Sequence, residues 1–356
     1  MIIPPEYVLG IQPYVPGKPI EELERELGIT NSIKLASNEN PIGPSPAALR
    51  AIGECVNELN RYPDGAGYYL KKALSEALGV EEQELILGNG SNELLDLAAK
   101  TFMRDGDEAV MATPSFVVYF MAVQSVGGKS VQVPLKDYTH NLAAMADALT
   151  PATKLVFIAN PNNPTGTMNG KDEFDRMMER IPDNVLVVID EAYYEYVSDP
   201  DYADSMKHLR SGKNVLILRT FSKIYGLAGL RIGYGIAKKE ILTAMNRLRA
   251  PFNTNTPAQK AALAALADKE HVALSRKVNE AGKEYLYREL RSLGAAFVPT
   301  EANFIYMPVE GSMTLYDKLL KMGVIVRPMG PNAVRVTIGL PEENRRFIEA
   351  LRAAKG

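Results

Sequence analysis

The sequence predicts an α/β protein in which a mainly parallel, seven-stranded sheet is flanked by helices and followed by a smaller α+β domain. Between about residues 45 and 249, short strand-like runs alternate with helix-like segments. Several of these runs are apolar throughout, which is typical of strands that are covered on both faces. After Pro251 the alternation stops, so a second domain with a different arrangement is expected.

The strand-like runs define the large domain. They cover residues 84–87, 108–111, 130–133, 155–159, 185–189, 215–218 and 232–236. Residues 46–59 and 68–78 show the helical spacing of apolar residues. Because functional groups of such sheets lie beyond the carboxyl ends of the strands, the loops that follow these runs are the places to search.

The remaining segments divide the chain into three parts. A long helical stretch over 257–293, broken near Asp268, leads to strands over 304–307, 324–327 and 333–338 and to a final helix over 341–353. The first 40 residues are rich in proline and hold one short helix near 20–27. We expect residues 1–40 to form an arm that packs with the small domain or a partner subunit, 41–250 the large domain, and 251–356 the small α+β domain.

Composition narrows the class of protein. The 356 residues carry a formal net charge of −3, whereas nucleic-acid binders are usually basic. No run approaches the roughly 18 apolar residues of a membrane span, and the N-terminus lacks the basic start of a secretion signal. The single cysteine, Cys55, excludes a disulfide framework within the chain and favours a reducing cytoplasm. The three histidines show no metal-ligand spacing, so no metal site is expected.

Two segments that follow strands carry groups suited to an anion and to a polar ring edge. Residues 87–93 (LGNGSNE) place Ser91 and Asn92 at a helix start, where free N–H groups attract a phosphate. Taken alone, this segment is better explained as an ordinary capped helix start. Residues 160–166 (NPNNPTG) have the proline and glycine of a turn, but turn chemistry does not explain two adjacent asparagines, of which Asn163 could serve as an amide donor.

Two further segments carry an acid, a phenol and an amine. Asp190 ends a buried apolar strand and needs a cationic partner, although a helix cap remains an alternative. Tyr193 could reach the same ligand if a helical turn begins there. Residues 220–223 (TFSK) place Lys223 after a strand and beside hydroxyls, with Arg231 eight positions later. Most lysines are solvated surface residues, but the fork of an arginine suits a phosphate.

Together the four segments match the needs of pyridoxal phosphate, which requires a Schiff-base lysine and an acid for its ring nitrogen. In order and spacing they resemble the fold-type I aminotransferases, and within these the histidinol-phosphate aminotransferase group. The resemblance covers nearly the whole chain. Further matching stretches are residues 14–19 (YVPGKP), 36–41 (ASNENP), 61–65 (RYPDG), 114–116 (PSF), 326–328 (VRP) and 334–339 (VRVTIG).

The resemblance implies a role for each matching residue at the cofactor. Lys223 holds the cofactor and moves the proton, Asp190 keeps the ring nitrogen protonated, and Tyr193 and Asn163 bond the phenolic oxygen. Phe116 stacks on the ring, unless it is an ordinary core aromatic. The residues implied to hold the phosphate are Ser91, Asn92, Thr220, Ser222 and Arg231, with Tyr62 reaching it from the neighbouring subunit of a homodimer.

The resemblance also implies the substrates and the reaction. Arg335 binds the anionic end of each substrate, assisted by Arg327 and Tyr14 and with Asn38 in the same site; a strand arginine paired with a surface acid is the simpler alternative for Arg335. Glutamate and 2-oxoglutarate exchange an amino group with histidinol phosphate and imidazole acetol phosphate, a step of histidine biosynthesis. The loop 328–334 (PMGPNAV) is shorter than in many relatives, so the shape of the distal pocket is open.

Three other functions fit parts of the same pattern. Transamination of aromatic amino acids would use the same residues with a different donor. Decarboxylation of threonine phosphate is a different reaction on the same scaffold. A cofactor-binding domain of a transcription regulator is the alternative from another class, but Lys223 is present, the net charge is negative and no winged-helix module precedes the fold.

Overall fold

The computed structural model describes residues 2–355, and its centre is a seven-stranded sheet. The strands are β2 (Leu85–Gly88), β3 (Glu108–Thr113), β4 (Lys129–Pro134), β5 (Thr153–Ala159), β6 (Leu186–Asp190), β7 (Val215–Thr220) and β8 (Gly233–Ala237). Their order across the sheet is β2-β8-β7-β6-β5-β3-β4. Only β8 runs against its neighbours, whereas the other pairs are parallel. The predicted fold class is confirmed.

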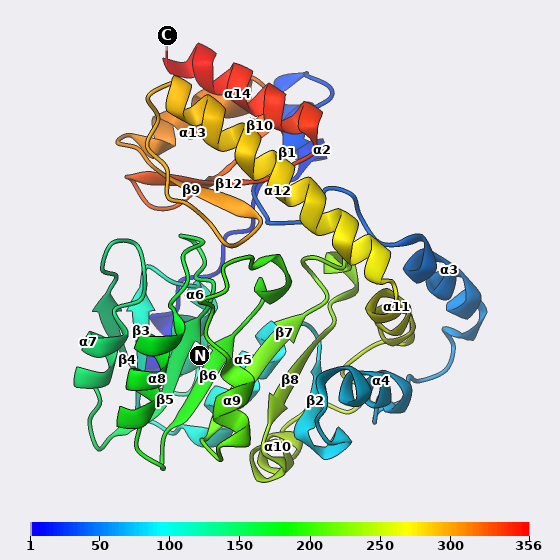
Figure 1. Ribbon diagram of the computed structural model, residues 1–356, viewed down its shortest axis with the longest axis vertical. Coiled ribbons are helices and arrows are strands. Elements are labelled where there is room, and N and C mark those ends of the chain that lie inside the picture. The colour runs from blue at the N-terminus through cyan, green and yellow to red at the C-terminus, as the bar shows by residue number, and fades with distance from the viewer. Residues whose placement is uncertain (1, 356) are drawn as a thin grey trace.

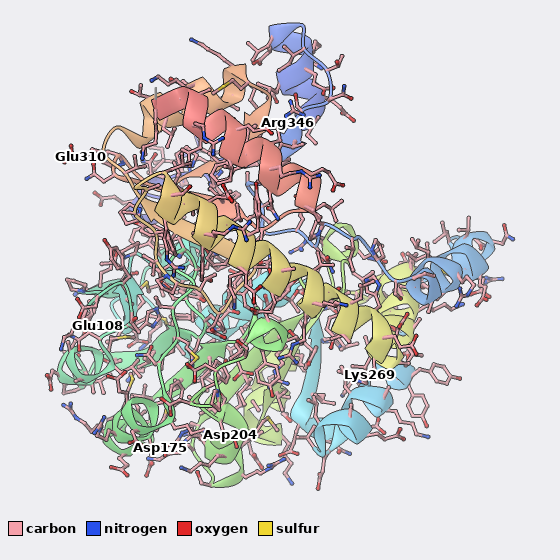
Figure 2. The ribbon with its side chains drawn as sticks, turned by 45° about the horizontal axis from the view of Figure 1, so that its top comes forward. Glu108, Asp175, Asp204, Lys269, Glu310 and Arg346 are labelled. Atoms are coloured by element: carbon pink, nitrogen blue, oxygen red, sulfur yellow. The ribbon has the colours of Figure 1, made fainter. Side chains whose placement is uncertain are left out.

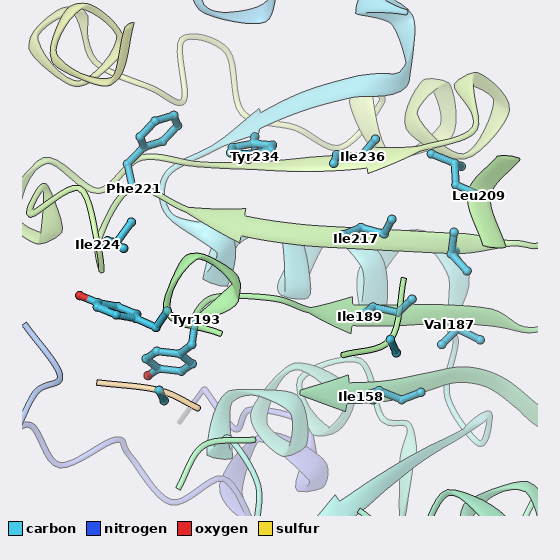
Figure 3. Packing of buried hydrophobic residues seen from close by; sticks show 14 of the residues in the cluster. Ile158, Val187, Ile189, Tyr193, Leu209, Ile217, Phe221, Ile224, Tyr234 and Ile236 are labelled. Atoms are coloured by element: carbon cyan, nitrogen blue, oxygen red, sulfur yellow. The ribbon is translucent and has the colours of Figure 1, made fainter. Parts of the chain in front are cut away.

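Each strand buries side chains on both faces, as the apolar runs predicted. Along β6, Val187 and Ile189 join one hydrophobic cluster, while Leu186 and Val188 join another. Because side chains alternate along a strand, the two clusters lie on opposite faces of the sheet. Figure 3 shows Ile158, Ile189 and Ile217 of the first cluster on neighbouring strands.

Helices cover both faces (Figure 1). The face of Ile189 is covered by α4 (Tyr68–Leu78), α7 (Leu142–Asp147), α8 (Lys171–Arg180), α9 (Ser205–Arg210) and α11 (Thr256–Ala267). The other face is covered by α5 (Ser91–Phe102), α6 (Val117–Gln124) and α10 (Lys239–Asn246). The helix α3 (Pro46–Cys55) packs mainly on α11. Short 3-10 turns are η1 (Val56–Glu58), η2 (Glu82–Glu84), η3 (Tyr194–Tyr196) and η4 (Ala228–Leu230).

A second, smaller layer lies over one edge of the large sheet (Figure 1). It contains the antiparallel strands β11 (Arg327–Pro328), β12 (Ala333–Thr337) and β9 (Phe304–Pro308). The helices α12 (Lys269–Ser292), α13 (Ser312–Lys321) and α14 (Pro341–Lys355) pack on these strands around a separate core. Asp268 ends α11 and caps α12 by accepting from the His271 N–H at 3.0 Å, which explains the predicted break.

The structure corrects two expectations about minor elements. The first 40 residues hold α1 (Glu6–Leu9) and β1 (Ile33–Lys34) besides the expected α2 (Ile20–Leu27). The expected strand over 324–327 is two strands, because β10 (Val324–Ile325) pairs with β1 and β11 pairs with β12. An apolar run marks extended chain, but which neighbour it pairs with depends on the tertiary structure.

The labelled charged residues Asp175, Asp204 and Lys269 lie at the periphery of the molecule (Figure 2).

Candidate active site

A cavity of about 190 Å³ opens where the carboxyl ends of the large sheet's parallel strands meet the smaller layer. Because β8 runs antiparallel, its amino end lies at this same edge and brings Arg231 there. The lining residues are Tyr14, Ser37, Asn38, Ser91, Asn92, Phe116, Tyr119, Ala159, Pro161, Asn163, Asp190, Ala192, Tyr193, Thr220, Ser222, Lys223, Arg231 and Arg335. Every residue predicted for the site except Tyr62 and Arg327 is therefore gathered around one cavity.

One end of the cavity is built to receive an anion. The helix α5 begins at Ser91, so its unpaired N–H groups point to the cavity and favour negative charge. The Arg231 guanidinium approaches from β8 and donates from Nη1 to Ser222 Oγ at 3.2 Å. A Cβ on Gly90 would lie 2.4 Å from Arg231 Nη2, so only glycine lets the arginine come this close. Two sources of positive potential, the start of α5 and the Arg231 guanidinium, thus converge at this end of the cavity.

Asp190 ends β6 in the cavity wall and is 6% exposed. Its Oδ2 accepts from the Tyr119 hydroxyl at 2.8 Å, and its Oδ1 accepts from the Ala192 N–H at 3.1 Å. Burial raises the pKa of Asp190 to about 6, although both donors act to lower it. A buried carboxylate of this kind requires a cationic partner, and the cavity leaves room for one.

Lys223 follows β7 and reaches into the cavity. Its Nζ donates to the Ser37 carbonyl at 3.3 Å and lies 5.7 Å from the centroid of the Tyr193 ring. Burial lowers the pKa of Lys223 to about 8, and the positive charge of Arg335 lowers it further. The neutral, nucleophilic amine is therefore a larger fraction of this lysine than of a solvated one, roughly a tenth at pH 7.

A hydrogen-bonded chain joins the two layers across the cavity. Asn38 Nδ2 donates to the Tyr193 hydroxyl at 2.9 Å, and burial raises the pKa of Tyr193 to about 12. The buried Arg335 on β12 donates from Nη1 to Asn163 Oδ1 at 2.5 Å and from Nη2 to the Ala36 carbonyl at 2.8 Å. Its Nε has no protein partner within residues 2–355, so this arginine keeps a donor for a ligand.

Two predicted residues lie away from the cavity in the single chain. Tyr62 is 82% exposed and stacks on Phe252, with ring centroids 4.6 Å apart. The Arg327 guanidinium lies 5.3 Å from the centroid of the Tyr14 ring, at the rim. Tyr62 therefore does not line the cavity of its own chain.

The sequence did not single out Tyr119 or the carbonyl of Ser37. Tyr119 lies on α6, three residues after Phe116, and its ring stacks on Phe157 at 5.1 Å. Its position three residues after Phe116 predicts that the two side chains are neighbours on the helix. Its bond to Asp190, however, depends on how α6 packs on the sheet. The Ser37 carbonyl has no sequence signal at all.

No group of three or more histidine, cysteine, aspartate or glutamate side chains that could hold a metal exists in the part of the chain that the structure describes. Within the same range, no helix is both long and apolar enough to cross a membrane.

Comparison with known proteins identifies the family. The profile of the family "aminotransferase class I and II" matches residues 30–351. The chain is 53% identical to the histidinol-phosphate aminotransferase of Moorella thermoacetica, over 98% of this chain and 92% of the relative. It is 49% identical to histidinol-phosphate aminotransferase 1 of Nitrosococcus oceani, over 97% and 94%.

A solved structure agrees with the sequence relatives. Histidinol-phosphate aminotransferase from Sinorhizobium meliloti, in complex with pyridoxal-5'-phosphate, superposes with a TM-score of 0.91 at 27% identity, over 98% of this chain and 96% of that chain. An aspartate aminotransferase from Thermus thermophilus, at 22% identity and a TM-score of 0.86, shows the same fold. The family predicted from the sequence is confirmed, and the chain belongs to the class I and II aminotransferases, within the group of histidinol-phosphate aminotransferases.

Proposed function

We propose that the protein transfers the amino group of L-histidinol phosphate to 2-oxoglutarate, giving imidazole acetol phosphate and L-glutamate, with pyridoxal 5'-phosphate as cofactor. The relatives from Moorella and Nitrosococcus, at 53% and 49% identity over nearly their whole lengths, support this step of histidine biosynthesis. The observation that carries the chemistry is the pairing of Lys223 with Asp190 in one cavity beside an anion-binding helix start.

The cavity fits the cofactor at three separate points. The start of α5, with Thr220, Ser222 and Arg231, offers donors for a doubly charged phosphate. At the other side, Asp190 is a buried carboxylate whose pKa is raised by burial, so a protonated ring nitrogen would supply its missing cation. Lys223 stands between the two with its amine turned into the cavity.

The cofactor, when bound, supplies a carbonyl carbon that bonds to amines and a ring that withdraws electrons from the neighbouring carbon. Lys223 would hold it covalently and, as a free amine, would take and return the proton that the reaction moves. Asp190 would keep the ring nitrogen protonated, and the Tyr119 hydroxyl orients that carboxylate. Tyr193 and Asn163 would bond the phenolic oxygen, and Phe116 would cover the ring.

Arg335 binds the anionic end of each substrate in turn. Its planar fork suits both a carboxylate and a phosphate, and its burial excludes water from that contact. Arg327 and Tyr14 at the rim assist with the longer substrate, and Asn38 orients the Tyr193 hydroxyl on the substrate side. This division lets one cavity accept two substrates of different length.

We also propose a homodimer in the cytoplasm, with residues 41–250 as the cofactor-binding domain, 251–356 as the small domain and 1–40 as an arm. The exposed pair Tyr62 and Phe252 supports an interface, because large aromatic side chains are seldom left in water. The large sheet lies within residues 85–237 and the small one within 304–337, which supports the division. The single cysteine supports a reducing compartment.

Two experiments test the proposal. Steady-state kinetics with histidinol phosphate, phenylalanine and tyrosine as donors to 2-oxoglutarate should give histidinol phosphate the highest kcat/KM. A higher value for an aromatic donor would overturn the assignment of the substrate. Release of carbon dioxide without amino transfer would favour decarboxylation. Borohydride reduction followed by peptide mapping should label Lys223, and Lys223→Ala should lose the absorbance of the bound cofactor and nearly all turnover. Label on another lysine would refute the mechanism.

A further inference from the structure

A buried ion pair lies beside the cavity, toward the face of the large sheet that carries Ile189 and Ile217. Glu191 follows Asp190 and Arg219 precedes Thr220, so alternation along the chain turns both side chains away from the cavity. Arg219 Nε donates to Glu191 Oε2 at 2.8 Å, and the two side chains are 7% and 1% exposed. The N–H of Glu191 donates to the Leu218 carbonyl at 2.8 Å, which keeps the pair in register with the sheet.

A second carboxylate stands beside this pair. Glu195 lies on η3, and its Oε2 is buried without a hydrogen-bond partner among the described residues, as is Oε1 of Glu191. The ring of Tyr194 lies over the Arg219 guanidinium at 3.6 Å and covers it. The ion pair of Arg219 is with Glu191, so Glu195 is a second carboxylate beside it, with a buried oxygen and no ion pair of its own among the described residues. Burial raises the pKa of Glu195 to about 7, although Arg219 acts to lower it.

The groups around Glu195 leave it short of positive charge. Beyond Arg219, Arg276 on α12 also acts on Glu195, but its Nη2 donates to the Val197 carbonyl at 2.7 Å at the exposed side. Burial raises the pKa of the tyrosines around the cluster whose shifts are resolved, so these stay neutral. The facing groups are Glu191, Tyr194 and Tyr196 on the same segment, Arg219 on β7, Tyr234 on β8, Arg276 on α12, and Tyr202 and Tyr225 on loops.

Two ionised carboxylates against one arginine would leave an uncompensated buried charge, which is strongly unfavourable. We propose that Glu191, Arg219 and Glu195 hold one proton between the two carboxylates, and that this charge-balanced cluster positions the turn that carries Asp190 and Tyr193. The turn is short and lies between the two carboxylates in sequence, because Glu191 precedes Tyr193 and Glu195 follows it. Two backbone bonds close it: the N–H of residue 194 donates to the Glu191 carbonyl at 3.1 Å, and that of residue 196 donates to the Tyr193 carbonyl at 2.9 Å.

The positioning role rests on the proposed function, because it assumes that Asp190 and Tyr193 act on the cofactor. The proton held between the two carboxylates does not depend on the proposed function, so the proton and the positioning role are tested separately. Infrared difference spectra of the holoenzyme, taken below and above neutral pH, report a protonated carboxyl directly. The wild type should show its band at the lower pH and lose it at the higher pH, and Glu195→Gln should lack the band.

Glu284→Gln is the matched control, since Glu284 is an exposed carboxyl on α12, and this variant should keep the band. A wild type without the band, or a band that survives in Glu195→Gln, overturns the shared proton. Neither result depends on whether the protein is an aminotransferase.

Kinetics test the positioning. Glu195→Gln imitates the protonated form, so its kcat should stay within about twofold of wild type near neutral pH and should lack the alkaline fall of the wild type. Arg219→Lys keeps the charge but loses the planar fork, so kcat should drop by about tenfold or more with little change in KM, and the circular dichroism of the bound cofactor should change. Wild-type kinetics and dichroism in Arg219→Lys, or an alkaline fall that persists in Glu195→Gln, overturn the positioning role. Absence of transaminase activity in the wild type would instead refute the proposed function.

Discussion

Replacing Gly90 with alanine should weaken cofactor binding through a single methyl group. Gly90 precedes α5 with φ 75° and ψ 168°, a conformation that L side chains rarely adopt. The added Cβ would lie 2.4 Å from Arg231 Nη2 and 3.1 Å from its Cζ. The guanidinium must therefore move away from the position in which it faces the start of α5 and contacts Ser222.

The substitution affects two different quantities, the stability of the fold and the affinity for the cofactor. The backbone strain costs about 1–3 kcal/mol of folding free energy, which is modest for a chain of this size. Displacement of Arg231 removes a hydrogen bond to a charged group, worth about 1.5–3 kcal/mol. The dissociation constant of pyridoxal phosphate should then rise roughly 10- to 150-fold.

The assay is titration of the apoprotein with pyridoxal phosphate, followed by the absorbance or fluorescence of the bound cofactor, together with thermal unfolding. Gly294→Ala is the matched control, because Gly294 has φ +59° but no atom within 4 Å of the added Cβ. This control should lose about 1–2 kcal/mol of stability and bind the cofactor as the wild type does. Wild-type affinity in Gly90→Ala would show that Arg231 does not hold the phosphate.

Three further predictions use other parts of the site. Tyr119→Phe removes the hydroxyl that lowers the pKa of Asp190, so the acidic limb of the kcat profile should move to higher pH and kcat should fall about tenfold; an unchanged profile would exclude this role. Lys223→Met should stabilise the apoprotein, because burial lowers the pKa of the lysine from 10.5 to about 8. The folded chain then binds this proton more weakly than the unfolded chain. The lysine therefore lowers the free energy of unfolding by up to about 3 kcal/mol below pH 8, and this effect fades as the pH rises to 10.5. Urea unfolding in which Lys223→Met stabilises the protein equally below pH 8 and near pH 10.5 would contradict this. If Tyr62 acts across a dimer interface, a heterodimer of one Tyr62→Ala chain and one Lys223→Ala chain has one intact site. The purified heterodimer should then have about half of the wild-type activity, and no recovery would place Tyr62 elsewhere.

Much of the large domain could be predicted because its signals are local. Each of the seven expected strands is present, since an uninterrupted apolar run buried on both faces leaves few alternatives. The turn residues after these strands placed Ser91, Asn163, Asp190 and Lys223 at one edge of the sheet. Strand order and the reversed direction of β8 were not predictable, because pairing partners come from distant parts of the chain.

By itself, the sequence determined the family, through its resemblance, and the fold class. Short-range spacing also placed Ser91, Asn163, Asp190 and Lys223 at strand ends, whereas Arg335 and Asn38 were identified by the resemblance alone. The tertiary structure alone decided how these groups contact one another. Tyr119 bonds Asp190 across 71 positions of sequence, Asn38 bonds Tyr193 across 155, and Arg335 bonds Asn163 across 172. The first bond needs α6 to pack on the large sheet, the second needs the arm, and the third needs the small layer to lie against the large one. No local pattern encodes such packing.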